Sequence, residues 1–355
     1  MAIPTEPIGS IPRPATLIAA WGDLQSGRIA RDEFARVADE ALVDTIRRFE
    51  ATGSPIITDG EQTKSSFATY PLDGATNLAP DGLVIPFEDG HTRQLPRLTA
   101  GPFRYATHAS AYLSHARPLT RRPIKQAVIS ASALSLLYPA SGIDGYSREA
   151  FLADLINEAE ADIRQCLALG ADSVQIDFTE GRLSLKLDPS GGLLGQFVAL
   201  NNQVLDRFTP AERQRLGVHT CPGGDRDATH SAGVDYAGLL PSLFQLRVGR
   251  FYVQLASESN PARVLGIIRG QLQPNHRVFV GVIDPIDPRV ETPDEVRDRV
   301  LLAARYLPVA QLGTTDDCGF SPFADDASTS RDVAFAKIQA RVTGTALAAE
   351  QLAGL

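Results

Sequence analysis

Long apolar runs, cysteine and clustered positive charge are all scarce in this sequence. No stretch of about 18 consecutive apolar residues occurs, so no membrane-spanning helix is predicted. The first residues lack a basic region followed by an apolar one, which argues against a signal peptide. The three cysteines cannot form a complete disulfide framework. These absences favour an intracellular, reducing compartment, and we expect a cytoplasmic protein.

Basic residues are outnumbered by acidic ones, 34 Lys and Arg against 42 Asp and Glu, which leaves a net charge of -8. Because nucleic-acid binders need a basic patch, no nucleic-acid partner is expected. The lack of an apolar span likewise argues against a membrane partner. With 43% hydrophobic and 21% charged residues, the composition is that of an ordinary globular protein. A chain of 355 residues can form one large α/β barrel or two smaller domains.

Helical and extended patterns alternate along most of the chain. Apolar residues recur at helical spacing over 32–50 and 148–169, and a short apolar run follows each of these segments. A third helix is predicted over 292–306, where Thr292 and Glu295 form a capping box. Such alternation predicts right-handed βαβ units and a parallel sheet.

Eight short strands are predicted, which is the number that closes a parallel barrel. They cover 6–10, 55–59, 124–130, 173–177, 215–219, 251–256, 278–284 and 310–315. Segment 66–122 is rich in Pro and Gly and poor in helix signal, so an inserted hairpin with loops is predicted after the second strand. A doubly wound open sheet is the main rival, but no Gly-x-Gly-x-x-Gly follows the first strand. We therefore predict the α/β class, with a (β/α)8 TIM barrel as a single catalytic domain over 1–355.

Polar side chains follow most of the predicted strands. Active sites of (β/α)8 barrels lie at the C-terminal ends of the strands. One polar residue at such a place means little, but polar residues after most of the strands are hard to obtain by chance. The residues concerned are Ser10, Asp59, Glu61, Asp177, His219, Cys221, Glu258, Asp284, Asp316, Asp317 and Cys318.

A metal site is predicted at three of these strand ends. His219 and Cys221 lie at positions i and i+2, which point to the same face of a strand. Cys318 follows the last strand, and Glu258 is positioned to add a carboxylate; imidazole, thiolate and carboxylate ligands are typical of zinc. His230, in the loop after the His-x-Cys motif, is an alternative ligand. It ranks below Glu258 because loop histidines are more often exposed to solvent.

A simpler interpretation of the His-x-Cys motif is a core histidine beside a buried cysteine. Cys318, at the equivalent place on another strand, makes that interpretation less favourable. Cys166 differs from the other two cysteines because it lies in the middle of a predicted helix. It is expected to pack as a small apolar side chain.

Several strand ends together resemble those of the cobalamin-independent methionine synthase family. Each motif is short, but the set occurs in the family's order and spans residues 8–320. The matching segments are Ile8-Gly9-Ser10-Ile11-Pro12-Arg13, Asp59-Gly60-Glu61, Gln175-Ile176-Asp177, His219-Thr220-Cys221 and Asp317-Cys318-Gly319. The resemblance implies a zinc-containing (β/α)8 barrel that moves a methyl group from a methylated folate to the sulfur of homocysteine.

The resemblance also implies a role for each matching residue. Ile8, Gly9 and Ser10 would bind the carboxylate of an amino-acid substrate. Glu61 and Asp177 would hold its ammonium group, although an ion pair with Arg or Lys at the barrel mouth is the simpler alternative. The zinc ligands would be His219, Cys221, Glu258 and Cys318. Coordination to zinc deprotonates a thiol, which is otherwise mostly protonated at neutral pH.

The sequence departs from the family pattern in three places. The family enzymes commonly carry a second, N-terminal barrel, whereas this chain resembles only the catalytic one. Ala256 stands where the family usually has its glutamate ligand, and Glu258 comes two residues later. Ile286 replaces a histidine thought to help protonate the folate. Either Asp284 or Asp287 takes that catalytic role, or the methyl donor is not a folate.

Several functions are compatible with these residues to different degrees. The first is a zinc-dependent methyltransferase that makes methionine or a related thioether from a small thiol and a methyl donor. The second is zinc-dependent alkyl transfer to another thiol, as in relatives that open epoxides with coenzyme M. Glu61 and Asp177 favour the first, because a sulfonate thiol brings no ammonium for them to bind.

Two further functions are weaker. A non-catalytic metal-binding or regulatory protein would use a closed structural zinc site, but such sites usually draw their ligands from short local loops. A decarboxylase of similar barrel shape would not need the His and Cys residues.

Overall fold

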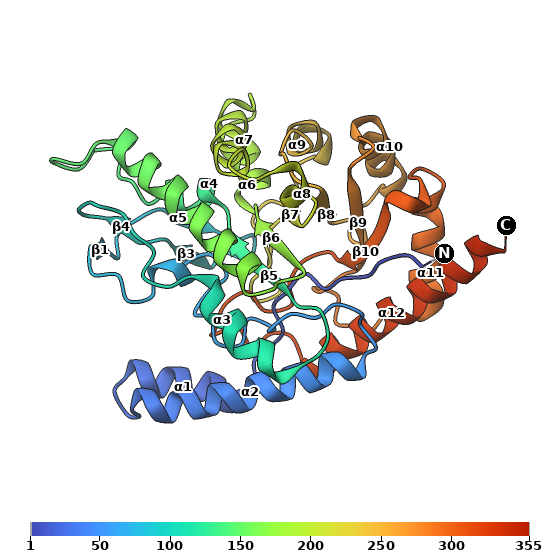
Figure 1. Ribbon diagram of the computed structural model, residues 1–355, viewed down its shortest axis with the longest axis horizontal. Helices are drawn as coiled ribbons and strands as arrows, with labels where there is room; N and C mark the ends of the chain where they lie inside the picture. Colours follow the sequence, from blue (N-terminus) through green and yellow to red (C-terminus); the bar gives the residue numbers. More distant parts are fainter. Residues whose placement is uncertain (1, 355) are drawn as a thin grey trace.

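The computed structural model describes residues 2–354, and a sheet of six parallel strands in the order β10-β9-β8-β7-β6-β5 lies at its centre (Figure 1). The strands are β5 (Lys125–Ile129), β6 (Ser173–Asp177), β7 (Leu216–Thr220), β8 (Arg250–Val253), β9 (Arg277–Ile283) and β10 (Leu312–Asp316). They correspond to the last six predicted strands. Every residue of β5, β6, β7 and β10 is buried, as expected for parallel strands covered on both faces.

Two further segments complete the ring of strands. Thr5 forms a parallel bridge to β10, and Ile57 forms one to the residue before β5. These two segments also contact each other, because Thr58 Oγ1 donates a hydrogen bond to the Gly9 carbonyl at 2.8 Å. The arrangement confirms the predicted α/β barrel.

The first two predicted strands are nevertheless only isolated bridges. The strands predicted at 6–10 and 55–59 contain Pro7 and Pro55, respectively. Proline has no N–H to donate to a strand ladder, so regular pairing cannot extend through it. The chain keeps its place in the barrel through single bridges and side-chain hydrogen bonds instead.

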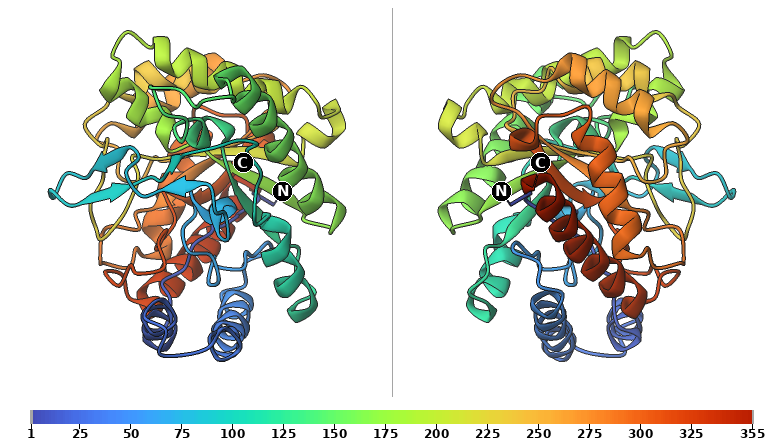
Figure 2. Two further views of the ribbon diagram at one scale, coloured as in Figure 1. Left: turned by 90° about the vertical axis from the view of Figure 1, so that its left-hand side faces the viewer. Right: turned by 90° about the vertical axis from the view of Figure 1, so that its right-hand side faces the viewer.

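Helices cover the outside of the sheet (Figures 1 and 2). They are α4 (Ala131–Ser135), α5 (Arg148–Ala168), α6 (Glu180–Leu187), α7 (Gly192–Leu205), α8 (Pro210–Arg213), α9 (Tyr236–Leu243), α10 (Pro261–Gln271), α11 (Pro293–Ala304), η3 (Val309–Gln311) and α12 (Arg331–Ala353). The predicted capping box at the start of α11 is present, with Thr292 and Glu295 each bonded to the other's backbone N–H. Cys166 is fully buried on α5, as predicted.

Two helices near the N-terminus form a separate pair. Helix α1 (Ala15–Gln25) packs on α2 (Arg31–Ala51) through Leu17, Ala38 and Ala41, which make a small apolar cluster of their own. Figure 2 shows this pair apart from the helices that surround the sheet. Helix α2 agrees with the prediction over 32–50.

The insertion after the second strand position contains hairpins, as predicted, and also a helix. Its elements are η1 (Tyr70–Leu72), β1 (Leu78–Ala79), β2 (Val84–Pro86), β3 (Thr92–Gln94), β4 (Arg97–Leu98), α3 (Ala109–Ala116) and η2 (Arg117–Leu119). Strand β1 pairs with β4 and β2 with β3, both antiparallel. The sequence did not predict α3. Its first N–H, that of Ala109, is bonded at 2.6 Å by the carboxylate of Asp162 in α5, and a cap from so distant a residue leaves no local sequence signal.

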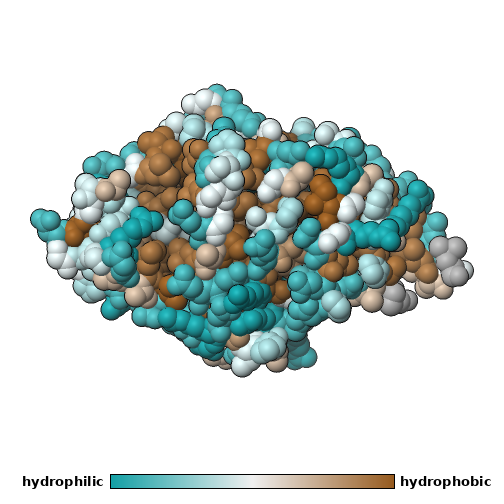
Figure 3. Space-filling model, turned by 90° about the horizontal axis from the view of Figure 1, so that it is seen from above, coloured by the Kyte–Doolittle hydropathy of each residue, from teal (hydrophilic) through white to brown (hydrophobic). Residues whose placement is uncertain are grey.

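Seen from above, over α7, α9 and α10, the surface shows apolar side chains interrupted by hydrophilic ones (Figure 3). Within residues 2–354, no helix has both the length and the apolar character needed to cross a bilayer.

Candidate metal centre and substrate cavity

A His-Cys-Cys group lies at the C-terminal end of the barrel strands. The potential ligand atoms of His219, Cys221 and Cys318 all lie within 4.8 Å of one another. His219 is in β7, Cys221 directly follows that strand, and Cys318 lies just beyond β10. The two sulfur atoms are 2.8 Å apart. The structure thus brings together three of the predicted zinc ligands from strands almost 100 residues apart in sequence.

The environment of this group suits a metal ion. Both ring nitrogens of His219 are buried and have no hydrogen-bond partner among the described residues. Buried polar atoms are rarely left in this state, and a bound ion would give one nitrogen its partner. Burial opposes ionisation of Cys221, but its contacts with Cys318 and His219 hold the pKa of its thiol well below the ordinary value. One imidazole and two thiols are a donor set that zinc prefers, so the residues fit this ion.

Neither candidate for a further ligand belongs to the group. The Glu258 carboxylate accepts hydrogen bonds from Arg182 Nη1 and Gln254 Nε2, both at 3.0 Å. His230 is only 5% exposed, so the expectation of a solvent-exposed loop histidine was wrong. The ring packs edge-on against Phe87 of the inserted hairpin, which explains its burial.

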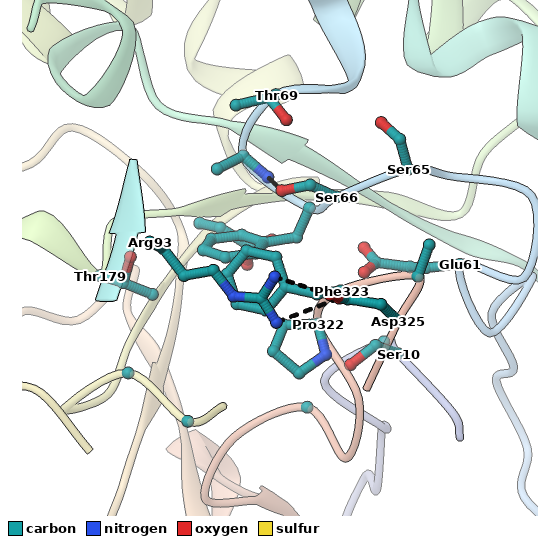
Figure 4. A pocket seen from close by; sticks show the side chains of 18 of the residues that line it. Ser10, Glu61, Ser65, Ser66, Thr69, Arg93, Thr179, Pro322, Phe323 and Asp325 are labelled. Atoms are coloured by element: carbon teal, nitrogen blue, oxygen red, sulfur yellow. Dashed lines mark hydrogen bonds and ion pairs between the residues drawn. The ribbon is translucent and has the colours of Figure 1, made fainter. Parts of the chain in front are cut away.

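A cavity of about 580 Å³ opens beside the metal group. Its wall includes His219 and Cys318. The predicted substrate-binding residues Ile8, Gly9, Ser10, Glu61 and Asp177 all line it as well. Figure 4 shows Ser10 and Glu61 close together on one side of this cavity. The residues predicted to hold an amino acid therefore share one space with two of the predicted metal ligands.

Glu61 is held in a strained and fully buried position. Its φ angle of 54° lies in the left-handed region, which is uncommon for a residue other than glycine. Its backbone N–H donates to Asp59 Oδ1 at 2.9 Å, and its carboxylate pairs with Lys64 Nζ at 3.2 Å. The ion pair proposed as the simpler interpretation is thus present for Glu61.

Asp177 has different surroundings. It lies at the end of β6 in register with His219 of β7, and it accepts a hydrogen bond from the neutral amide of Gln175 at 2.7 Å. Burial raises the pKa of Asp177 to about 6, against the opposing effect of His219. Of the two predicted ammonium-binding residues, Asp177 is the one bonded to an uncharged group.

Arg13, which sequence reasoning missed, joins the segments that form this side of the cavity. It is buried, and its guanidinium donates to the carbonyls of Glu61, Lys64 and Ser321 at 2.7, 2.8 and 3.2 Å. Ser10 Oγ accepts the Ser321 N–H at 3.1 Å. The only sequence signal for Arg13 was its place beside the Ile-Gly-Ser motif.

The inserted hairpin of β2 and β3 covers part of the cavity. Arg93 pairs with Asp225 at 2.5 Å and with Asp325 at 3.0 Å, and its guanidinium lies over the ring of Phe323. Figure 4 shows the contact between Arg93 and Asp325 across the cavity. His91 adds a contact of 2.9 Å to Asp225. These contacts attach the hairpin to the loops that follow β7 and β10.

A second cavity, of about 380 Å³, adjoins the first. Cys318 and Gly319 line both cavities, and Asp284 and Glu258 line the second. Asp287 is not among the lining residues of either cavity, and its carboxylate accepts the N–H of Arg289 at 2.9 Å. Of the two predicted catalytic aspartates, only Asp284 therefore lines a cavity that Cys318 also lines.

The fold and this site together define a (β/α)8 barrel with a His-Cys-Cys group that could hold a metal ion, beside a cavity at the C-terminal ends of its strands. Comparison with known proteins identifies the family. The family described as the catalytic domain of cobalamin-independent synthases matches residues 3–337, so the chain belongs to that family.

Curated relatives include a 5-methyltetrahydropteroyltriglutamate–homocysteine methyltransferase of Nitratidesulfovibrio vulgaris Hildenborough, 26% identical over 320 residues. That match covers 89% of this chain but 38% of the relative, so the chain spans about two fifths of that protein's length. A methionine synthase of Thermococcus kodakarensis is 21% identical, with 99% of this chain and 95% of the relative covered. The chain therefore corresponds to almost the whole of some relatives and to part of others.

Two solved structures have the same fold. A B12-independent methionine synthase from Shewanella sp. W3-18-1, in complex with selenomethionine, superposes with a TM-score of 0.77 at 20% identity, covering 100% of both chains. A putative vitamin-B12-independent methionine synthase from Listeria monocytogenes gives 0.72 at 20% identity, covering 98% of each chain. At this level of identity the superpositions support the barrel fold alone.

Proposed function

We propose that this protein transfers a methyl group to the sulfur of a small thiol, with homocysteine as the acceptor, methionine as the product and zinc as the bound metal. The observation that carries the proposal is the group of His219, Cys221 and Cys318, because His219 and Cys318 lie in the wall of a cavity that Glu61 and Asp177 also line. The names of the curated relatives support the same reaction. The methyl donor is a methylated folate or another small methylated molecule.

The residues take the following roles in this proposal. His219, Cys221 and Cys318 hold the ion, and Glu258 is the proposed fourth ligand, which requires its carboxylate to leave Arg182. Bound zinc keeps a coordinated thiol ionised at neutral pH. The backbone and hydroxyl group around Ser10, with Ile8 and Gly9, hold the substrate carboxylate. Asp177 and Glu61 hold its ammonium group.

The transfer itself needs little from the protein beyond position and charge. The thiolate sulfur forms a bond to the methyl carbon while the bond between that carbon and the donor breaks, and the donor keeps the electron pair. Asp284 lines the second cavity together with Cys318, and in this proposal it gives a proton to the departing donor. Asp287 remains a weaker candidate for that role because it lines neither cavity.

Alkyl transfer to a sulfonate thiol such as coenzyme M remains the second candidate. Asp177 argues against it, because this buried carboxylate is bonded to the neutral amide of Gln175 and faces the cavity. A sulfonate in the same cavity would add negative charge beside it. An ammonium group would instead supply the missing positive charge.

Metal analysis of purified protein tests the central part of the proposal. We expect about one zinc per chain in the wild type and a marked loss in Cys221→Ser, because a thiolate ligand is removed. Cys166→Ala is the matched control: Cys166 lies in the core, so this variant should keep its zinc while losing about 1–2 kcal/mol of stability. Full zinc occupancy in Cys221→Ser would refute the assignment.

A thiol screen tests the reaction. The zinc-loaded protein is incubated with methyl-labelled folate, in mono- and polyglutamate forms, and with homocysteine or a sulfonate thiol, and labelled thioether is detected by mass spectrometry. Labelled methionine is the expected product. Thioether from the sulfonate thiol alone would favour the second candidate, and failure of every folate with homocysteine would exclude a folate donor.

A further inference from the structure

The loop after β7 holds His230 in a fixed position. Its backbone N–H donates to the Pro222 carbonyl at 3.1 Å, and its own carbonyl accepts a hydrogen bond from Lys186 Nζ at 2.8 Å. Because both backbone polar groups are bonded, the side chain projects from a constrained point of the loop. The proposed methyl transfer assigns no role to His230.

The imidazole ring of His230 is also fixed. The ring of Phe87, in the inserted hairpin, meets it edge-on at a centroid distance of 5.6 Å. Gly223 lies close on another side: a Cβ there would stand 2.0 Å from His230 Nε2, and the φ angle of 73° is one that side chains rarely allow. Glycine at this position therefore makes room for the imidazole.

One polar atom of this ring, Nδ1, lacks a protein partner that would explain its burial. His230 is 5% exposed, and its Nδ1 has no hydrogen-bond partner among the described residues. The ring lines the same cavity as His219 and Cys318 but lies outside the metal group. Buried polar side chains are nearly always hydrogen-bonded, and an exception beside a cavity indicates a partner that is bound there.

The charges around the cavity indicate what that partner offers. Arg93 is the only Arg or Lys among the described lining residues, and Asp225 and Asp325 already occupy its guanidinium. A substrate carboxylate has two oxygens to be satisfied. Ser10 can donate one hydrogen bond through its hydroxyl, whose oxygen already accepts the Ser321 N–H. Besides the backbone of this segment, the His230 imidazole in the cavity wall is available as a further donor.

We propose that His230 is a substrate-binding residue that donates a hydrogen bond to the carboxylate of the thiol amino acid in this cavity. The inference rests on the proposed function, since it presupposes an amino-acid thiol. Burial lowers the pKa of His230 to about 4, so at neutral pH the ring carries one N–H donor and no charge. It thereby recognises a carboxylate without adding a cation beside the metal group.

Three thiols separate the carboxylate contact from the ammonium contact. Homocysteine has both groups, 4-mercaptobutanoate has only the carboxylate, and 3-aminopropanethiol has only the ammonium. Binding of each to zinc-loaded protein is measured by calorimetry for the wild type, His230→Phe and His230→Gln. In His230→Phe, affinity for the first two thiols should fall about 10- to 150-fold, as for one hydrogen bond to a charged group, with 3-aminopropanethiol little changed. His230→Gln keeps an N–H donor and should recover part of the loss.

A second histidine variant serves as the control for the loss of a buried imidazole. His276→Phe removes another buried histidine, packed between Phe244 and Phe251 and not among the lining residues of the cavity, and should bind all three thiols as the wild type does. Equal affinity of the wild type and His230→Phe for homocysteine would overturn the inference. An equal loss of affinity for all three thiols would also overturn it. Loss of zinc from both His230 variants would overturn it as well, because His230 would then be a metal ligand. Failure of the zinc-loaded wild type to bind homocysteine would instead refute the proposed function.

Discussion

Asp177→Asn is the substitution that most directly tests how a thiol substrate is recognised. Asp177 and Glu61 face one cavity, but they are not equivalent. Glu61 is already paired with Lys64 at 3.2 Å, whereas Asp177 is bonded to the neutral amide of Gln175. The negative charge available to a substrate ammonium is therefore mainly that of Asp177. The Asn side chain keeps the shape of the carboxylate and removes its charge.

The size of the effect follows from the type of contact. A hydrogen bond to a charged group contributes about 1.5–3 kcal/mol, so Asp177→Asn should weaken binding of homocysteine by about 10- to 150-fold. Glu61→Gln is a poorer test, because it leaves the buried Lys64 ammonium without its partner. Breaking a buried ion pair in this way costs roughly 3–5 kcal/mol of stability. A loss of binding in that variant would not separate recognition from folding.

The assay compares homocysteine with its analogue that lacks the amino group, on zinc-loaded wild type and Asp177→Asn. The analogue should bind poorly to the wild type and lose little further affinity in the variant. Zinc content should stay the same, because Asp177 is not in the metal group. If the analogue binds the wild type as tightly as homocysteine does, the ammonium contact does not exist and a non-amino-acid thiol becomes the better acceptor.

The remaining predictions concern stability and the hairpin. Burial raises the pKa of Glu180 from 4.5 to about 7, so its protonated form favours the folded state, and that contribution is lost as pH rises through about 7. The free energy of unfolding of Glu180→Gln should therefore exceed that of the wild type by up to about 3 kcal/mol at pH 8 but not at pH 4. Urea unfolding at both pH values measures this difference. An equal difference at the two pH values would contradict the prediction. Arg93→Gln removes the contacts to Asp225 and Asp325, so hydrogen exchange should accelerate in the hairpin of β2 and β3 and not in β5–β8. Unchanged exchange would show that the hairpin is held by other contacts.

The barrel could be predicted because its signals are local. Apolar runs for the six paired strands and the capping box at Thr292 are each contained in a few residues. The two segments with Pro7 and Pro55 were assigned to the correct positions but do not pair as regular strands. Helix α3 was missed because the carboxylate that binds its first N–H comes from Asp162, more than 50 residues later.

The site could be predicted only as far as strand geometry allowed. The spacing of His219 and Cys221 on one face of β7, and the place of Cys318 after β10, follow from the strand pattern. The contacts of Glu258 do not follow from the strand pattern, because its partner Arg182 lies 76 residues away on α6. The burial of His230 depends on a hairpin more than 130 residues earlier, so its loop position alone gave the wrong expectation.

The wall shared by the two cavities has a kinetic consequence. Cys318 and Gly319 line both spaces, so there is room for one small molecule in each cavity at the same time. Neither molecule has to leave before the other arrives. For the proposed methyl transfer, this arrangement favours direct transfer within a ternary complex over a mechanism in which the protein itself is methylated between the binding of the two substrates.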